Sequence, residues 1–171
     1  AAESGVLTLT SDDQVNGVIG KAVNFDGPAA AAGDYIRIPN SSVLDNTGNM
    51  TVSAWFRLSN GGSSDYFGIA GKYRDSDPNY YGYVLGRAQS QRVRFSIGTG
   101  GSGAGSFVES NSTLIDNNWH YAVGTVTGGT LRLYLDGVAQ SATATGVPLP
   151  SGDYAVIGRR AGNLDNSYFI G

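Results

Sequence analysis

The sequence has no cysteine, a single histidine and only two glutamates. Without cysteine there can be no disulfide, no thiolate catalysis and no cysteine-ligated zinc site. Charged residues make up 15% of the chain, against roughly 25% in an average protein. The net charge of −3 and the pI of about 4.9 argue against a nucleic-acid partner, which requires a basic surface. No apolar run reaches the ~20 residues of a membrane helix, so we expect no membrane insertion.

Glycine, by contrast, is abundant, with 26 of 171 residues, and nearly all acidic residues are aspartates. Aspartate and glycine favour turns, whereas glutamate and lysine favour helices. A hydrophobic content of 40% supports a packed core, and the length suits one domain of ordinary size. We therefore expect a single all-β domain over residues 1–171.

Short stretches of alternating apolar and polar residues recur along the chain, with turn residues between them. The longest, residues 51–58, places Phe56 on one face and Trp55 on the other. Gly128-Gly129 and Asp136-Gly137 supply the positive φ angles that tight hairpins require. This pattern predicts a two-sheet antiparallel β-sandwich. The predicted strands are residues 6–10, 21–25, 35–38, 51–58, 67–72, 80–87, 92–97, 119–126, 130–135, 138–140 and 154–157.

Six motifs follow one another in a characteristic order: GKAVNFDG at 20–27, DYIRIP at 34–39, MTVSAWF at 50–56, NWHYAV at 118–123, LRLYLDGV at 131–138 and IGR at 157–159. Together they resemble the laminin-G-like, concanavalin A-like lectin/glucanase domains of bacterial secreted proteins, from about Gly20 to Gly171. The resemblance implies a jelly-roll sandwich, often with a structural Ca²⁺, and a secreted, extracellular or bacterial cell-surface location. It also implies a role in binding glycans or proteins as a module of a larger enzyme or adhesin.

One departure from the family concerns the end of the sequence. Members usually continue past the Tyr-Phe-x-Gly motif, here residues 168–171, into a further strand. We therefore expect the chain to be a segment of a larger protein, with other domains of the same polypeptide among its partners. Without that last strand, its neighbours would expose unpaired backbone groups.

Catalytic residues are hard to assemble. Glycoside hydrolases use two carboxylates, which families resembling this one place as Glu-x-Asp-x-Glu on one strand. Here the glutamates, Glu3 and Glu109, lie far apart, and Asp75 and Asp77 fall in a predicted loop. His120 is the sole histidine, and the strand motif of sandwich-fold lyases is not identifiable. The sequence predicts a non-catalytic domain, with a polysaccharide lyase or glycoside hydrolase as an alternative.

For the Ca²⁺ that the resemblance implies, the ligands would have to converge from separate loops, since no EF-hand spacing occurs. Asp26 is the first choice because family members often hold the ion near the loop after the Phe-Asp-Gly strand, and Asp34 is the second. Asp26-Gly27 can equally be a simple turn.

The region from Tyr66 to Arg94 is rich in tyrosine and in charge. A sugar ring is bound by an aromatic side chain under its apolar face and by polar groups around its rim. Arg92 and Arg94 share one strand face and would suit an acidic polysaccharide. Alternatively, the tyrosines pack in the core and the arginines are merely solvated; Trp55 and Trp119 are expected in the core. The predicted sugar-binding residues are Tyr73, Arg74, Asp75, Asp77, Asn79, Tyr80, Tyr81, Arg87, Arg92 and Arg94.

These observations favour a non-catalytic, lectin-like carbohydrate-binding module that holds a larger secreted polysaccharide-active enzyme on its glycan. The alternative is an adhesion or structural module of a bacterial surface protein that binds another protein. Exposed aromatic residues on one face would favour the first reading. A flat apolar patch or a strand-accepting sheet edge would favour the second.

Overall fold

The computed structural model describes residues 13–25, 34–58, 66–76, 79–102, 105–114, 116–159 and 169–171, with the side chains of residues 75, 76 and 102 left out. The described residues form strands and one short 3-10 turn, η1 (Ser42–Leu44). No helix among them is long and apolar enough to cross a membrane. The strands are β1 (Gln14–Asn16), β2 (Lys21–Val23), β3 (Ile36–Ile38), β4 (Met50–Arg57), β5 (Phe67–Ser76), β6 (Asn79–Arg87), β7 (Arg92–Ser102), β8 (Ser106–Thr113), β9 (Trp119–Thr127), β10 (Thr130–Leu135), β11 (Val138–Ala139), β12 (Ala144–Thr145) and β13 (Ala155–Ile157).

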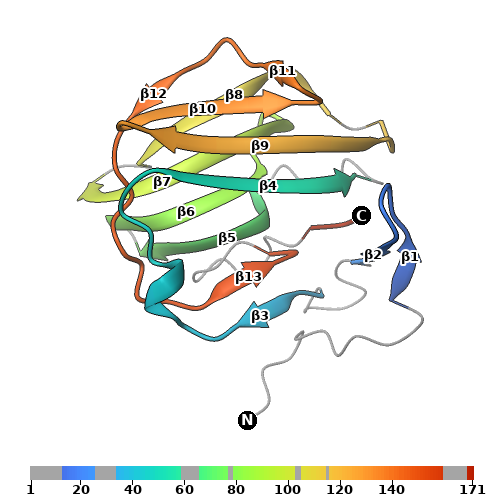
Figure 1. Ribbon diagram of the computed structural model, residues 1–171, viewed down its shortest axis with the longest axis horizontal. Coiled ribbons are helices and arrows are strands. Elements are labelled where there is room, and N and C mark those ends of the chain that lie inside the picture. The colour runs from blue at the N-terminus through green and yellow to red at the C-terminus, as the bar shows by residue number, and fades with distance from the viewer. Residues whose placement is uncertain are drawn as a thin grey trace.

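Two antiparallel sheets face each other (Figure 1). The front sheet in that view has the strand order β11-β10-β9-β4, with β12 also paired to β10. The sheet behind it has the order β3-β13-β5-β6-β7-β8, and β1 and β2 form a separate hairpin. The chain changes sheet between β4 and β5 and again between β8 and β9. This arrangement confirms the predicted jelly-roll sandwich.

The core fills the space between the sheets, because apolar residues alternate along the strands. Val93, Phe95 and Ile97 of β7 are fully buried, as is Leu131 of β10. Gly124 of β9 lies directly against the Phe95 ring, where any Cβ would collide with it. The absence of a side chain at this position therefore lets the two sheets approach closely.

Two turns that the sequence predicts are present and have the expected backbone. Gly128 and Gly129 join β9 to β10 with φ angles of 54° and 75°, and Asp136 and Gly137 join β10 to β11 with φ angles of 51° and 80°. Consecutive positive φ values are those of a type I′ turn, whose twist matches that of the flanking strands. These turns fix the register of β9, β10 and β11.

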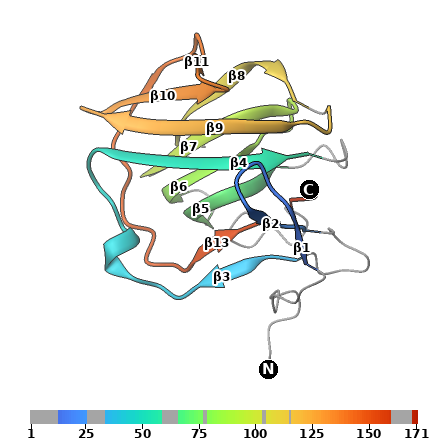
Figure 2. The same ribbon diagram turned by 45° about the vertical axis from the view of Figure 1, so that its right-hand side comes forward.

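Strand β4 has an open edge. It pairs along its whole length with β9, and no strand within the described ranges lies on its other side. The β1–β2 hairpin lies beside its carboxyl-terminal end in both views (Figures 1 and 2). Gly171 lies there too, against the Arg57 carbonyl, and exchanges backbone hydrogen bonds of 2.9 and 3.2 Å with Phe25. The sandwich is thus open along the outer side of β4.

Candidate functional site

The tyrosines predicted to bind sugar lie on β5 and β6 but do not form one platform. Tyr73 is 2% exposed, and its ring stacks on that of half-buried Tyr80 at 6.1 Å between centroids. Tyr81 is paired opposite Arg74, whose guanidinium lies 5.7 Å from the Tyr81 ring. Since side chains alternate along a strand, Tyr80 and Tyr81 point to opposite faces of the sheet.

Three other residues of this region, Asn79, Asp75 and Asp77, were also predicted to bind sugar. The Asn79 backbone pairs with Ser76 and that of Asp75 with Tyr80. The Asp75 side chain, like all of Asp77, lies outside the described part of the chain. The structure therefore does not unite these polar groups with the tyrosines into one site.

Three of the four predicted arginines, Arg87, Arg92 and Arg94, already have partners within the protein; the fourth, Arg74, is the one that lies near the Tyr81 ring. Arg87 is 2% exposed, with its guanidinium 4.6 Å from the Phe67 ring, and is too deep to meet a ligand at the surface. Arg92 donates a hydrogen bond of 2.9 Å to the Ser110 carbonyl.

Arg94 donates two hydrogen bonds, of 2.8 and 2.5 Å, to one carboxylate oxygen of Glu109, its register partner on β8. Its guanidinium lies 3.8 Å from the centroid of the Phe107 ring and 4.9 Å from that of the Tyr66 ring. Glu109 thus partly neutralises the positive charge of Arg92 and Arg94, the two residues predicted to bind an acidic glycan. The strand pairing that brings Glu109 there could not be read from the sequence.

The predicted metal ligands are only partly visible. Asp34 is half-buried next to β3, whereas Asp26 lies outside the described residues. In the part of the chain that the structure describes, no group of three or more histidine, aspartate and glutamate side chains could hold a metal ion. The Ca²⁺ ion therefore remains a prediction.

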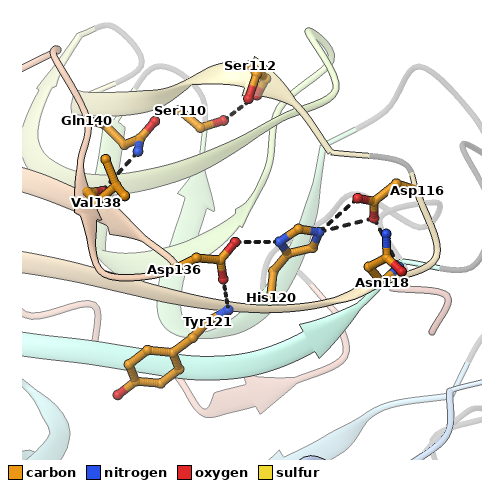
Figure 3. Close-up of polar contacts among 9 residues, drawn as sticks. All are labelled: Ser110, Ser112, Asp116, Asn118, His120, Tyr121, Asp136, Val138 and Gln140. Atoms are coloured by element: carbon orange, nitrogen blue, oxygen red, sulfur yellow. Dashed lines mark hydrogen bonds and ion pairs between the residues drawn. The ribbon is translucent and has the colours of Figure 1, made fainter.

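His120 lies between two carboxylates (Figure 3). Its Nδ1 is 2.7 Å from Asp136 Oδ2, and its Nε2 is 3.1 Å from Asp116 Oδ1. Burial lowers the His120 pKa, but hydrogen bonding to Asp136 and Asp116 outweighs it, and the pKa is raised overall. The pKa of Asp116 falls to about 2, chiefly because it accepts a hydrogen bond from the Asn118 backbone.

The role of this cluster is to hold the backbone. Asp136 Oδ1 accepts a hydrogen bond from the Tyr121 amide at 2.8 Å, and the Asp136 amide donates one of 2.9 Å to the Tyr121 carbonyl. The histidine thereby ties the β10–β11 turn to the start of β9. Both carboxylates are engaged by His120, which is unlike the two free carboxylates of a glycosidase.

The exposed aromatic surface that the sequence analysis missed lies on the other sheet. Trp55 is 44% exposed, and its ring lies 5.1 Å from that of Tyr121, its cross-strand partner on β9. The expectation that Trp55 lies in the core was wrong. Alternation along β4 held the correct signal, because the core face of that strand is taken by Phe56 and Ala54.

A cavity of about 450 Å³ opens beside Trp55, between the carboxyl-terminal half of β4 and the β1–β2 hairpin. Its inner wall is the apolar core, and its polar contributors include Ser53, Lys21 and Arg57. No aspartate or glutamate is among the described residues that line it. The lining residues are Gly17, Val18, Ile19, Lys21, Ala22, Val23, Phe25, Ile36, Ser53, Ala54, Trp55, Phe56, Arg57, Ile69, Ala70, Trp119, Ile157, Phe169 and Gly171.

The protein is thus a β-sandwich with a cavity, lined in part by Trp55 and Trp119, at the edge of one sheet. Residues 30–171 match the family model described as the concanavalin A-like lectin/glucanases superfamily, and the chain belongs to that superfamily. This bears out the resemblance seen in the sequence motifs. A search of curated proteins gave no match.

Solved structures share the architecture. Domain 4 of AbnA, an extracellular GH43 arabinanase from Geobacillus stearothermophilus solved with arabinotriose, is 16% identical with a TM-score of 0.57, over 92% of this chain and 69% of that one. Tailspike protein 2 of Escherichia coli O157:H7 bacteriophage CAB120 is 12% identical with a TM-score of 0.52, over 89% of this chain and 22% of that one. Carbohydrate-binding module CBM66 from Bacillus subtilis is 18% identical with a TM-score of 0.46, over 84% of this chain and 81% of that one. At these identities the likeness to the arabinanase domain and to the tailspike protein shows the fold alone.

Proposed function

We propose that this protein is a non-catalytic carbohydrate-binding module whose sugar-stacking residue is Trp55. The observation that carries the proposal is the 44% exposure of Trp55, which also lines the cavity beside β4. A pyranose or furanose ring has an apolar face of C–H groups that packs on an indole, and hydroxyls that need polar partners around it. Ser53, Lys21 and Arg57 stand in the lining to supply such partners.

The platform is held in place before any ligand arrives. Trp55 and Tyr121 are cross-strand neighbours, and their rings meet at 34°, so each restricts the other's rotamers. Little conformational entropy is then lost on binding. A shallow site of this kind gives dissociation constants in the micromolar to millimolar range, or ~4–8 kcal/mol.

A binding role rather than hydrolysis is supported by the state of the carboxylates. Within the described ranges, Glu109 is paired with Arg94, and Asp116 and Asp136 are paired with His120. None of these is left to act as a free acid, base or nucleophile. As a part of a larger secreted polypeptide, the module would keep a polysaccharide-active enzyme on its substrate; the occurrence of this fold as domain 4 of an extracellular arabinanase supports that arrangement.

The test is binding to a panel of soluble and insoluble polysaccharides by pull-down and calorimetry. We expect Trp55→Ala to weaken binding at least tenfold, because loss of a central aromatic contact commonly removes 2 kcal/mol or more. Phe107→Ala is the matched control, since Phe107 is a 40% exposed aromatic residue on the other sheet. Binding that survives in Trp55→Ala and is lost in Phe107→Ala would move the site to the six-stranded sheet.

A second function, binding of another protein, is favoured by the open edge of β4. An edge strand can accept an extended peptide through backbone hydrogen bonds. Next to it, Val18 and Ile19 of the β1–β2 hairpin are 46% and 80% exposed, as an apolar docking surface would be. Trp55→Ala distinguishes the two functions: it should remove sugar stacking, whereas docking of an extended protein strand through the β4 backbone should persist.

A further inference from the structure

The charges around the Trp55 cavity point to the class of sugar that enters it. We propose that the ligand is an anionic glycan, one whose sugars carry a carboxylate, and that Arg57 and Lys21 recognise that carboxylate. This inference rests on the proposed function, because it names the ligand class of the same site.

Arg57 is the first of the two cations that line the cavity. Its guanidinium lies 5.5 Å from the centroid of the Trp119 ring, and Nε is buried with no hydrogen-bond partner. Within the described residues it makes no ion pair, unlike Arg94, which is paired with Glu109. A buried guanidinium N–H without an acceptor is unfavourable, and stacking on an aromatic ring leaves the planar fork free to pair with an anion.

Lys21 is the second cation that lines the cavity. It belongs to the β1–β2 hairpin that forms the opposite wall of the cavity. Its ammonium group donates a hydrogen bond of 3.0 Å to the neutral side chain of Asn16, so its charge is not compensated there. Within the described part of the chain, neither cation is thus paired with a carboxylate.

Among the residues that the structure describes, the cavity lining supplies no opposing charge. All described lining residues other than Lys21 and Arg57 are neutral, although the whole chain carries −3. The recess is thus a positive site in an acidic protein, and it adjoins the apolar face of Trp55. A uronic-acid sugar matches both features, because its ring has an apolar C–H face and its carboxylate accepts paired guanidinium hydrogen bonds. A neutral sugar would match only the first feature.

The ligand itself provides the cleanest test. A polyuronate such as polygalacturonate is compared with the same polymer after chemical reduction of its carboxyl groups to alcohols, so that backbone and ring shape are kept. We expect the reduced polymer to bind the wild-type protein about tenfold to a hundredfold more weakly, as for loss of charge-assisted hydrogen bonds. Binding of the polyuronate should also weaken as salt is raised, because the cations lie near the surface.

Substitution then assigns the effect to residues. Arg57→Gln and Lys21→Gln should each reduce the preference for the polyuronate, whereas Arg57→Lys should keep part of it. Arg37→Gln is the control, because this substitution removes an equal charge from the other sheet. The Arg37 guanidinium lies 4.3 Å from the centroid of the Tyr154 ring. Thermal melting checks that each variant is folded.

The outcomes separate the two proposals. Equal binding of both polymers, with both lost in Trp55→Ala, would refute the anionic-ligand inference and leave the carbohydrate-binding function standing. A polyuronate preference that disappears equally in Arg37→Gln would refute the assignment to this cavity. Binding of neither polymer, nor of any neutral glycan, would refute the proposed function and this inference together.

Discussion

Replacing Lys72 with methionine should destabilise the protein more than any surface charge substitution. Lys72 is 0% exposed, and its ammonium lies 2.5 Å from Asp45 Oδ2 and 3.0 Å from the Ser41 carbonyl. Asp45 also accepts a hydrogen bond from the Ser151 amide at 3.2 Å. The pair therefore ties β5 to the loop after β3 and to the loop before β13. Burial, and then the Asp45 charge, raise the pKa of the adjoining Tyr83 phenol.

The size of the effect follows from what the substitution leaves behind. Lys72→Met leaves the Asp45 carboxylate, only 14% exposed, without its cation. Removing one member of a buried pair typically destabilises by about 3–5 kcal/mol. The total stability of a protein is ~5–15 kcal/mol, so about a fifth of it or more is at risk, and Tm should fall by roughly 10 °C.

The assay is urea unfolding with thermal melting as a second readout. Arg74→Met is the matched control, because Arg74 lies two residues further along the same strand with an exposed side chain; it should change stability by less than about 0.5 kcal/mol. The double variant Lys72→Met/Asp45→Asn removes both charges and should be more stable than the sum of the single losses predicts. A loss below about 1 kcal/mol in Lys72→Met would refute the description of this pair as buried and mutually dependent.

Two further predictions concern ionisation and metal. The hydrogen-bonded carboxylates raise the pKa of His120 in the folded protein. The charged histidine therefore contributes its full stabilisation at pH values below its ordinary pKa of about 6.5. This stabilisation is lost as the pH rises through the pKa of the folded state. The stability difference between wild type and His120→Gln, measured by urea unfolding, should accordingly be larger at pH 5 than at pH 9; a difference that grows with pH would contradict the cluster. For Ca²⁺, the ion expected near Asp26 and Asp34 should raise Tm over that in EDTA, and the increase should vanish in Asp26→Asn; identical melting curves with and without the ion would remove Ca²⁺ from the account.

Most strands and the two hairpin turns could be predicted because their signals are local, whereas β8 (Ser106–Thr113), which is rich in serine and polar residues, was missed. Alternation along residues 51–58 separates Phe56 from Trp55, and the Asp136-Gly137 pair specifies its turn without help from the rest of the chain. Each of these features needs only neighbouring residues. The superfamily followed from six such local motifs in the correct order, and the match over residues 30–171 confirms it.

The candidate site could not be predicted, because it depends on contacts between distant segments. The cavity forms where the β1–β2 hairpin meets β4, and no sequence pattern sets that distance. Arg94 looked like a sugar-binding residue until the register of β7 and β8 placed Glu109 beside it. Tyr80 and Tyr81, in contrast, were within reach of sequence reasoning, since adjacent residues in a strand cannot share a face.

The most direct measurement of the central claim uses the protein's own fluorescence. The chain has two tryptophans, Trp55 and Trp119, and both line the cavity, so indole emission reports on this site alone. Titration of the Trp119→Phe variant with a glycan that binds in pull-down should give a saturable change in Trp55 emission, with the dissociation constant found by calorimetry. Calorimetric binding without any change in emission would place the sugar elsewhere and contradict the account.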